Sequence, residues 1–116
     1  MRIDVRGHEI AVTREIRNHV ERRLQFALGR FGRHVRRVTV RLSDVNGPRG
    51  GADKTCRIAV AMPRHQGMVV EDADASLYVA VDRAAERAGR MVTRYLTRIR
   101  DSHRTPAAEL VAGDLR

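Results

Sequence analysis

The sequence predicts an α+β fold, a two-layer β-α-β-β-β-α domain whose four-stranded mixed sheet carries two helices on one face. Short segments alternate apolar and polar residues, as half-buried strands do. Two longer segments repeat apolar residues at helical spacing. A helix between the first two strands makes them a parallel pair, and hairpins are expected between the others. Both helices then cover the same face of the sheet, and the other face is left to solvent.

The strands are predicted over residues 2–6, 35–43, 54–62 and 68–71. In the first three, apolar side chains fall on one side of the pleat and polar or small side chains on the other. Gly7 is expected to end the first strand.

The first helix is predicted over residues 14–28, with Thr13 as its N-cap and with Gly29 and Gly32 ending it. The second helix is predicted over residues 76–100, and its first residue is a serine that can cap it. Apolar residues on one side of each helix are expected to face the sheet.

The length of 116 residues fits a single domain, predicted over residues 1–101. Residues 102–116 are expected to form a flexible C-terminal tail. The glycine-rich stretch at residues 44–53 is interpreted as a flexible hairpin loop. The alternative is a phosphate cradle of backbone N–H groups, with Arg49 and Lys54 beside it.

The composition favours a nucleic-acid partner and, second, an anionic membrane surface. The net charge is +9, and most of the basic residues are arginine, which forks onto phosphate groups. Aromatic residues make up only 3% of the chain, which argues against a single-strand binder built on base stacking. Recognition of folded RNA or DNA through its backbone fits better.

The cellular compartment follows from two other features. A single cysteine allows no internal disulfide, which fits a reducing cytoplasm, and no apolar segment is long enough to span a membrane. The sequence therefore predicts a cytoplasmic protein whose partner is nucleic acid and not a membrane.

Five arginines of the second predicted helix fall within one narrow sector of its surface. We call this set the arginine row: Arg83, Arg87, Arg90, Arg94 and Arg98. Like charges three or four residues apart destabilise a helix, and the nearest carboxylates, Asp82 and Glu86, only flank the sector. The row is interpreted as a surface for phosphate groups, and the alternative is an ordinary solvated face.

A second basic group belongs to the first predicted helix and its exit. Arg22 and Arg23 project from the sides of that helix. The exit carries Arg30, Arg33, Arg36 and Arg37 without an acidic residue between them. Basic residues are common at helix C-termini because they interact favourably with the helix dipole, but four are more than this effect requires. They are therefore interpreted as RNA contacts.

No pattern in the sequence indicates an enzyme, a metal site or a cofactor. The five histidines are scattered without the spacing of metal ligands. Cys56 falls on the apolar side of its predicted strand, so a buried thiol is expected. The carboxylates are few and most lie at helix caps or flanks.

The chain resembles the ribosome hibernation-promoting factor family, also called ribosome-associated inhibitor or sigma-54 modulation protein. The resemblance covers residues 2–100. It rests on the element order, on Thr13 opening the first helix, on the RRL segment at 22–24 and on Phe31. Its most specific part is SLYVAVD at residues 76–82, followed by the arginine row.

The resemblance implies a fold similar to a double-stranded-RNA-binding domain with an added first strand. It also implies a ribosome-binding translation inhibitor that contacts 16S-type rRNA of the small ribosomal subunit in the mRNA and tRNA channel. Such a factor silences and protects idle ribosomes in stationary phase or under stress. The expected form is the family's short, monomeric one, without the C-terminal domain through which long forms pair ribosomes.

The resemblance also bears on residues. Four members of the arginine row align with basic positions of the family, as do Arg23 and Arg33. The full RNA-binding set that we expect is Arg22, Arg23, Arg30, Arg33, Arg36, Arg37, Arg83, Arg87, Arg90, Arg94 and Arg98. The chain departs from the family at Ser76, where Asp is more frequent, and at Phe26 and Arg30, where Lys and Tyr are frequent.

Two other functions compete with ribosome binding. A general double-stranded nucleic-acid-binding protein would coat any duplex, with a steep dependence on salt. A regulator of another protein would keep its function when the arginine row is replaced.

Overall fold

The computed structural model describes residues 1–44, 53–63 and 67–112, with side chains up to Asp101. Its elements are β1 (Arg2–His8), α1 (Arg14–Leu28), the 3-10 helix η1 (Gly29–Phe31), β2 (Arg37–Asp44), β3 (Lys54–Ala61), β4 (Met68–Asp74) and α2 (Leu77–Ala112). The sheet order is β1-β2-β3-β4, with β1 parallel to β2 and the other neighbours antiparallel. The predicted element order and mixed sheet are confirmed. Most of the predicted glycine-rich loop, residues 45–52, lies outside the described residues.

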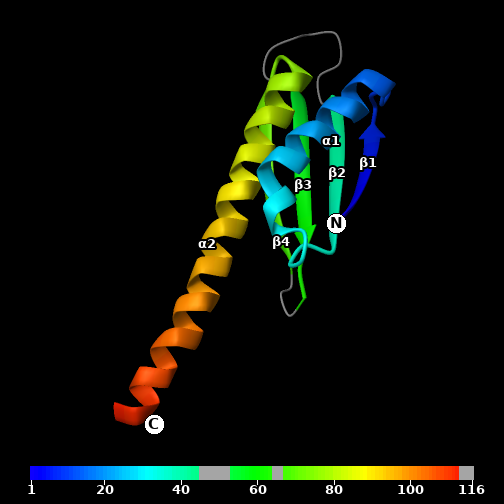
Figure 1. Cartoon of the computed structure of the whole chain (residues 1–116). Coiled ribbons are helices and arrows are strands. Elements are labelled where there is room, and N and C mark those ends of the chain that lie inside the picture. The colour runs from blue at the N-terminus through cyan, green and yellow to red at the C-terminus, as the bar shows by residue number, and fades with distance from the viewer. Residues whose placement is uncertain (45–52, 64–66, 113–116) are drawn as a thin grey trace.

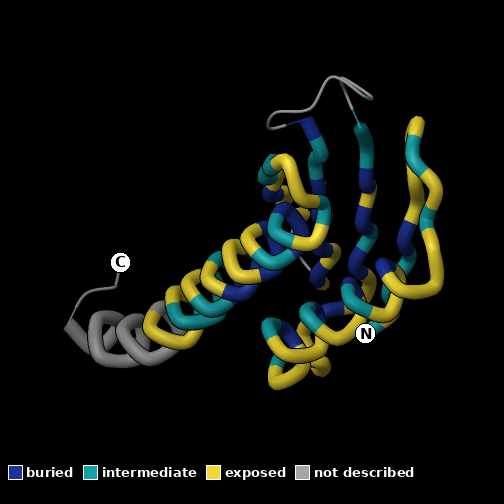
Figure 2. Tube along the Cα trace, turned by 90° about the horizontal axis from the view of Figure 1, so that it is seen from above, coloured by how far each residue is buried: buried dark blue, intermediate teal, exposed yellow. Residues whose placement is uncertain are grey.

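Both helices cover one face of the sheet, and the other face has no layer on it (Figures 1 and 2). The inward side chains of the strands and the apolar sides of both helices form one buried cluster. α1 contributes large residues such as Val20 and Leu24, whereas α2 contributes a run of small ones such as Ala84 and Ala88. Small side chains allow α2 to approach the sheet closely, so this helix packs directly on β3 and β4.

α1 has the predicted bounds. The side-chain oxygen of Thr13 accepts a hydrogen bond from the backbone N–H of Ile16 at 3.2 Å, which satisfies one of the free donors at the helix start. The helix ends at Leu28, but Gly29 and Gly32 keep right-handed helical φ angles of −57° and −54°. The chain therefore leaves α1 through the tighter turn of η1 and not through a left-handed glycine.

β1 is longer than predicted, because Gly7 does not end it. The strand continues to His8, and Gly7 pairs with Leu42 of β2. A Cβ atom at position 7 would collide with the carbonyl oxygen of Ile10. The glycine is therefore needed where the chain folds back over the end of the strand, and the reversal itself occurs at Glu9, whose φ is 61°.

The other strands differ from prediction at their ends. β2 begins at Arg37, because Val35 donates its N–H to the carbonyl oxygen of Phe31 at 3.0 Å and so belongs to the turn after η1. β4 continues past the predicted end at residue 71 to Asp74. Two aspartates that the sequence assigned to a connection therefore lie in the edge strand of the sheet.

α2 begins as predicted and ends later. The hydroxyl of Ser76 accepts the N–H of Val79 at 3.4 Å, so this residue is the expected N-cap. The helix does not stop at residue 100 but continues to Ala112, and its C-terminal half extends beyond the sheet (Figure 1). The helical pattern beyond Asp101 corrects the predicted helix end, whereas the division into a domain and a flexible tail stays a prediction.

Candidate nucleic-acid interface

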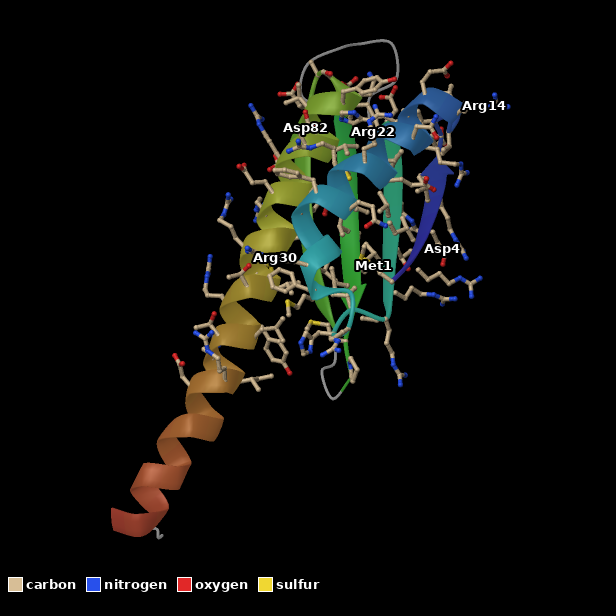
Figure 3. The ribbon with its side chains drawn as sticks, in the orientation of Figure 1. Met1, Asp4, Arg14, Arg22, Arg30 and Asp82 are labelled. Atoms are coloured by element: carbon tan, nitrogen blue, oxygen red, sulfur yellow. The ribbon has the colours of Figure 1, made fainter. Side chains whose placement is uncertain are left out.

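The arginine row runs along one side of α2, between the side that faces α1 and the side that faces β4. All five of its side chains are exposed. Figure 3 shows nitrogen-tipped side chains along the outer edge of this helix. Along a helix axis, residues four positions apart lie about 6 Å apart and residues three apart about 4.5 Å, so the row spaces its positive charges nearly evenly.

The first two members of the row are tied to the edge strand. The guanidinium of Arg83 lies 3.3 Å from a carboxylate oxygen of Asp74. That of Arg87 lies 3.6 Å from a carboxylate oxygen of Asp72 and donates a 2.6 Å hydrogen bond to the carbonyl oxygen of Glu71. The sequence contains no acid within the row's sector of the helix, but the tertiary fold brings two acids from β4 beside it.

The last three members of the row are less neutralised. Arg90 lies 3.5 Å from Glu86 one turn earlier, an exposed pair of small energetic value. Arg94 and Arg98 have no hydrogen-bond or ion-pair partner in the part of the chain that the structure describes. Among the described side chains of α2, the unpaired positive charge therefore lies in the C-terminal part of the arginine row, beyond the acids of β4.

Two arginines from α1 and η1 face this part of α2. Arg30 donates a hydrogen bond to the hydroxyl of Thr93 at 3.3 Å, and its guanidinium lies 4.7 Å from the centre of the Phe31 ring. Arg23 lies 5.6 Å from the centre of the Phe26 ring. The hydrogen bond to Thr93 positions Arg30 opposite the C-terminal part of the row (Figure 3).

A groove of about 680 Å³ lies between α1 with η1, which contribute Arg23 and Arg30, and α2, which contributes the C-terminal part of the arginine row. Its walls are Arg23, Phe26, Ala27, Arg30, Glu86, Gly89, Arg90, Thr93, Arg94, Thr97 and Arg98. Glu86 is its one acidic lining residue against five arginines, so the groove is strongly cationic. We call it the interhelical groove. Its floor lies where Gly89 meets Ala27, since a Cβ at position 89 would be 3.1 Å from the Ala27 carbonyl oxygen.

The remaining predicted RNA-binding arginines lie elsewhere. Arg22 lies on the side of α1 that faces β1, in a depression shared with Met1 and Ile3. Arg37 lies 3.3 Å from Asp4 at the start of β2. Arg33 and Arg36 are exposed in and after the turn that follows η1. The structure thus brings seven of the eleven expected residues to the groove or the row, and the other four to separate positions.

The open face of the sheet carries its own basic group. Arg6 pairs with Arg41 across β1 and β2, and Arg41 pairs with Arg57 across β2 and β3. We call these three residues the open-face arginines. Arg57 is 3.9 Å from Glu71 on β4. The open-face arginines are separated from the interhelical groove by the whole thickness of the domain.

Sequence reasoning missed two residues of the site. Asp82 accepts a hydrogen bond from Nε2 of His19 at 2.7 Å, and the Nε atom of Arg23 lies 3.2 Å from the same oxygen. Asp82 therefore connects the two helices, and its partner is too distant in the chain to be found by spacing. Phe26 is 81% exposed, and a helical wheel would have placed it off the apolar side of α1.

The buried thiol expected at position 56 is confirmed. Cys56 is fully buried, and burial, reinforced by Asp72 and Glu71, raises its pKa to about 12. Among the described residues, no group of three or more His, Cys, Asp or Glu side chains is arranged to hold a metal ion. In the same residues, no helix combines the length and the apolar character that crossing a membrane requires.

Comparison with known proteins gives a family and a fold. Residues 3–100 match the family model of the sigma 54 modulation protein / S30EA ribosomal protein. The crystal structure of the Thermus thermophilus Protein Y N-terminal domain is 31% identical, with a TM-score of 0.68 over 82% of this chain and 99% of that one. A ribosomal subunit interface protein from Coxiella burnetii is 15% identical, with a TM-score of 0.69 over 84% and 99% of the two chains, which supports the fold. No curated protein matches the chain.

Proposed function

Because the chain belongs to the sigma 54 modulation protein / S30EA ribosomal protein family, we propose that it binds the small ribosomal subunit through its rRNA. The bound protein occupies the channel of mRNA and tRNA. It thereby silences idle ribosomes and protects them under stress or in stationary phase. The family supplies the ribosome as partner, and the charges of the two helices supply the means of binding.

The observation that carries this proposal is the concentration of free arginines around the interhelical groove. Arg94 and Arg98 are exposed and have no partner in the described chain, and Arg30 faces them from η1. An unpaired guanidinium offers several N–H donors in the geometry that a phosphate accepts. Neutralising several phosphates releases condensed counterions, which is the main source of affinity for nucleic acid.

The proposed mechanism is occlusion. The arginines fix the domain on rRNA phosphates, and its bulk excludes mRNA and tRNA from the same space. The second half of α2 extends beyond the sheet and adds to the excluded volume (Figure 1).

Co-sedimentation with ribosomes on a sucrose gradient tests the proposal. The wild-type chain should remain on small subunits at about one copy each at roughly physiological salt. The variant Arg90→Glu, Arg94→Glu, Arg98→Glu should be lost from the subunit fractions, because it reverses the charge where the row has no β4 acid beside it. Thermal stability should stay close to that of the wild type, because all three positions are exposed and the one ion pair lost, Arg90–Glu86, is an exposed pair of small energetic value.

The matched control reverses the same number of charges elsewhere. Arg6, Arg14 and Arg17 are exposed, and Arg14 lies at the end of α1 farthest from the groove (Figure 3). Their triple Glu variant should still sediment with subunits. Equal retention of both variants would refute the role of the row. Release of the wild type at physiological salt, or equal binding to any duplex RNA, would favour a general duplex binder.

A further inference from the structure

We propose that the interhelical groove binds an unpaired nucleotide of RNA, with its base stacked on Phe26 and its phosphates on Arg90, Arg94 and Arg98. The inference extends the proposed function, since it names the kind of RNA that the groove takes. It does not depend on the ribosome, because a free single strand offers the same chemistry.

Phe26 is unusual for an aromatic residue of a folded domain. Its side chain is 81% exposed, although the chain has only two phenylalanines and the other one packs against the core. The hydrophobic effect favours burying such a ring, and α1 buries four aliphatic residues on its other side without it. A large exposed apolar side chain at the rim of a groove indicates a contact surface.

The surroundings of the ring specify what it can contact. Arg23 lies 5.6 Å from the ring centre, so the aromatic surface is already paired with a positive charge. On the opposite wall, the groove presents Arg90, Arg94 and Arg98. An occupant must therefore combine a planar apolar group with negative charge a few ångströms away. A nucleotide combines them in one unit, whereas an acidic peptide supplies mainly the charge.

The occupant must also be unpaired. Within a duplex, both faces of each base are covered by its neighbours in the stack, so a side chain on the outside cannot reach them. A base in a loop, bulge or single strand exposes a face, and stacking on an aromatic side chain accepts any base. The groove is open to solvent and has a volume of about 680 Å³, which admits a base with its sugar.

The chain contains no tryptophan, so Phe26→Trp creates a single fluorescent reporter at the proposed stacking position. A short single-stranded RNA should quench this fluorescence to saturation. The same strand annealed to its complement should leave it nearly unchanged at concentrations where the single strand saturates. Gln25→Trp is the matched control, because it lies one residue away on α1, is exposed, and lines a different depression next to Met1.

Affinity provides a second readout that keeps all arginines in place. Phe26→Ala and Phe26→Leu should each weaken binding of the single strand about 10-fold, the usual loss for one stacked base. Phe26→Trp should retain binding, and none of the three should change binding of a duplex. Because position 26 is exposed, these substitutions are expected to leave folding intact, which circular dichroism checks.

Three results would overturn the stacking site. They are equal quenching by single strand and duplex, equal quenching of both tryptophan variants, and unchanged affinity of Phe26→Ala. Quenching by polyglutamate equal to that by RNA would reassign the groove to an acidic protein segment. Ribosome sedimentation is a separate measurement, so a failure of the proposed function leaves the fluorescence result readable, and the reverse also holds.

Discussion

At the scale of single residues, Cys56 is a titratable group that the fold removes from water. The residue lies on β3 opposite Asp72 of β4, and its side chain is fully buried under α2. Burial disfavours the thiolate, and the carboxylates of Asp72 and Glu71 disfavour it further, so the pKa is raised to about 12. The folded protein therefore holds a neutral thiol that is a poor nucleophile at any physiological pH.

The raised pKa predicts a loss of stability at alkaline pH. Below pH 9, both folded and unfolded states hold the proton and the thiol contributes no pH dependence. Between about 9 and 12, the unfolded thiol ionises and the folded one does not, so stability should fall by up to about 1.4 kcal/mol per pH unit. Urea unfolding of wild type and Cys56→Val at several pH values isolates this contribution. Parallel stability curves for the two proteins above pH 9 would contradict it.

At the scale of elements, the two helices are held together by small residues and one carboxylate. Gly89 lies against Ala27, and the carboxylate of Asp82 accepts a hydrogen bond from Nε2 of His19 on α1. The close approach determines the depth of the interhelical groove, because the backbones meet where the groove has its floor. The hydrogen bond at Asp82 aligns the two helices nearer their N-terminal ends.

A side chain at position 89 should therefore separate the helices. Gly89→Val adds atoms where even a Cβ would be 3.1 Å from the carbonyl oxygen of Ala27, and overpacking of this kind costs about 1–3 kcal/mol. Arg94→Val is the matched control, since it places the same residue at an exposed position of α2 and costs a few tenths of a kcal/mol at most. Urea unfolding measures both. Equal stability of the two variants would mean that α1 and α2 do not need this contact.

At the scale of the whole molecule, two groups of basic residues lie on opposite sides of the described part of the domain. The helix side carries the arginines of the interhelical groove, and the sheet side carries the open-face arginines. Like charges opposite each other across strands are unfavourable, as they are along a helix. Charge alone does not distinguish the two surfaces, but the helix side adds a groove and an exposed aromatic ring.

The salt dependence of binding should distinguish them. Each phosphate contact contributes about 0.7–0.9 to the slope of log affinity against log salt concentration. Replacing Arg90, Arg94 and Arg98 by Gln should lower the slope for small subunits by about 2–3. Replacing the open-face arginines by Gln should leave it nearly unchanged, although the net charge falls equally. Equal changes in slope would mean that RNA contacts both sides of the domain.

The sequence by itself determined the element order, the mixed sheet, the helix caps and the burial of Cys56. These features depend on periodicity and on residues near each other in the chain, such as Thr13 and Ile16. The basic sector of α2 follows from the same kind of pattern, because a helix places residues three or four apart on one side. The same helical periodicity places Phe26 off the apolar side of α1, where the structure has it exposed.

Only the tertiary structure decided which arginines of the row are paired with an acid and which are free. Asp72 and Asp74 reach Arg87 and Arg83 because β4 runs beside α2, and no spacing in the sequence encodes that edge. The continuation of β4 to Asp74 depends on the same neighbours, since isolated aspartates disfavour a strand. The groove needs both helices at contact distance, which the packing at Gly89 provides. Local patterns are set by bonded geometry, whereas these contacts join residues that only the packed core brings together.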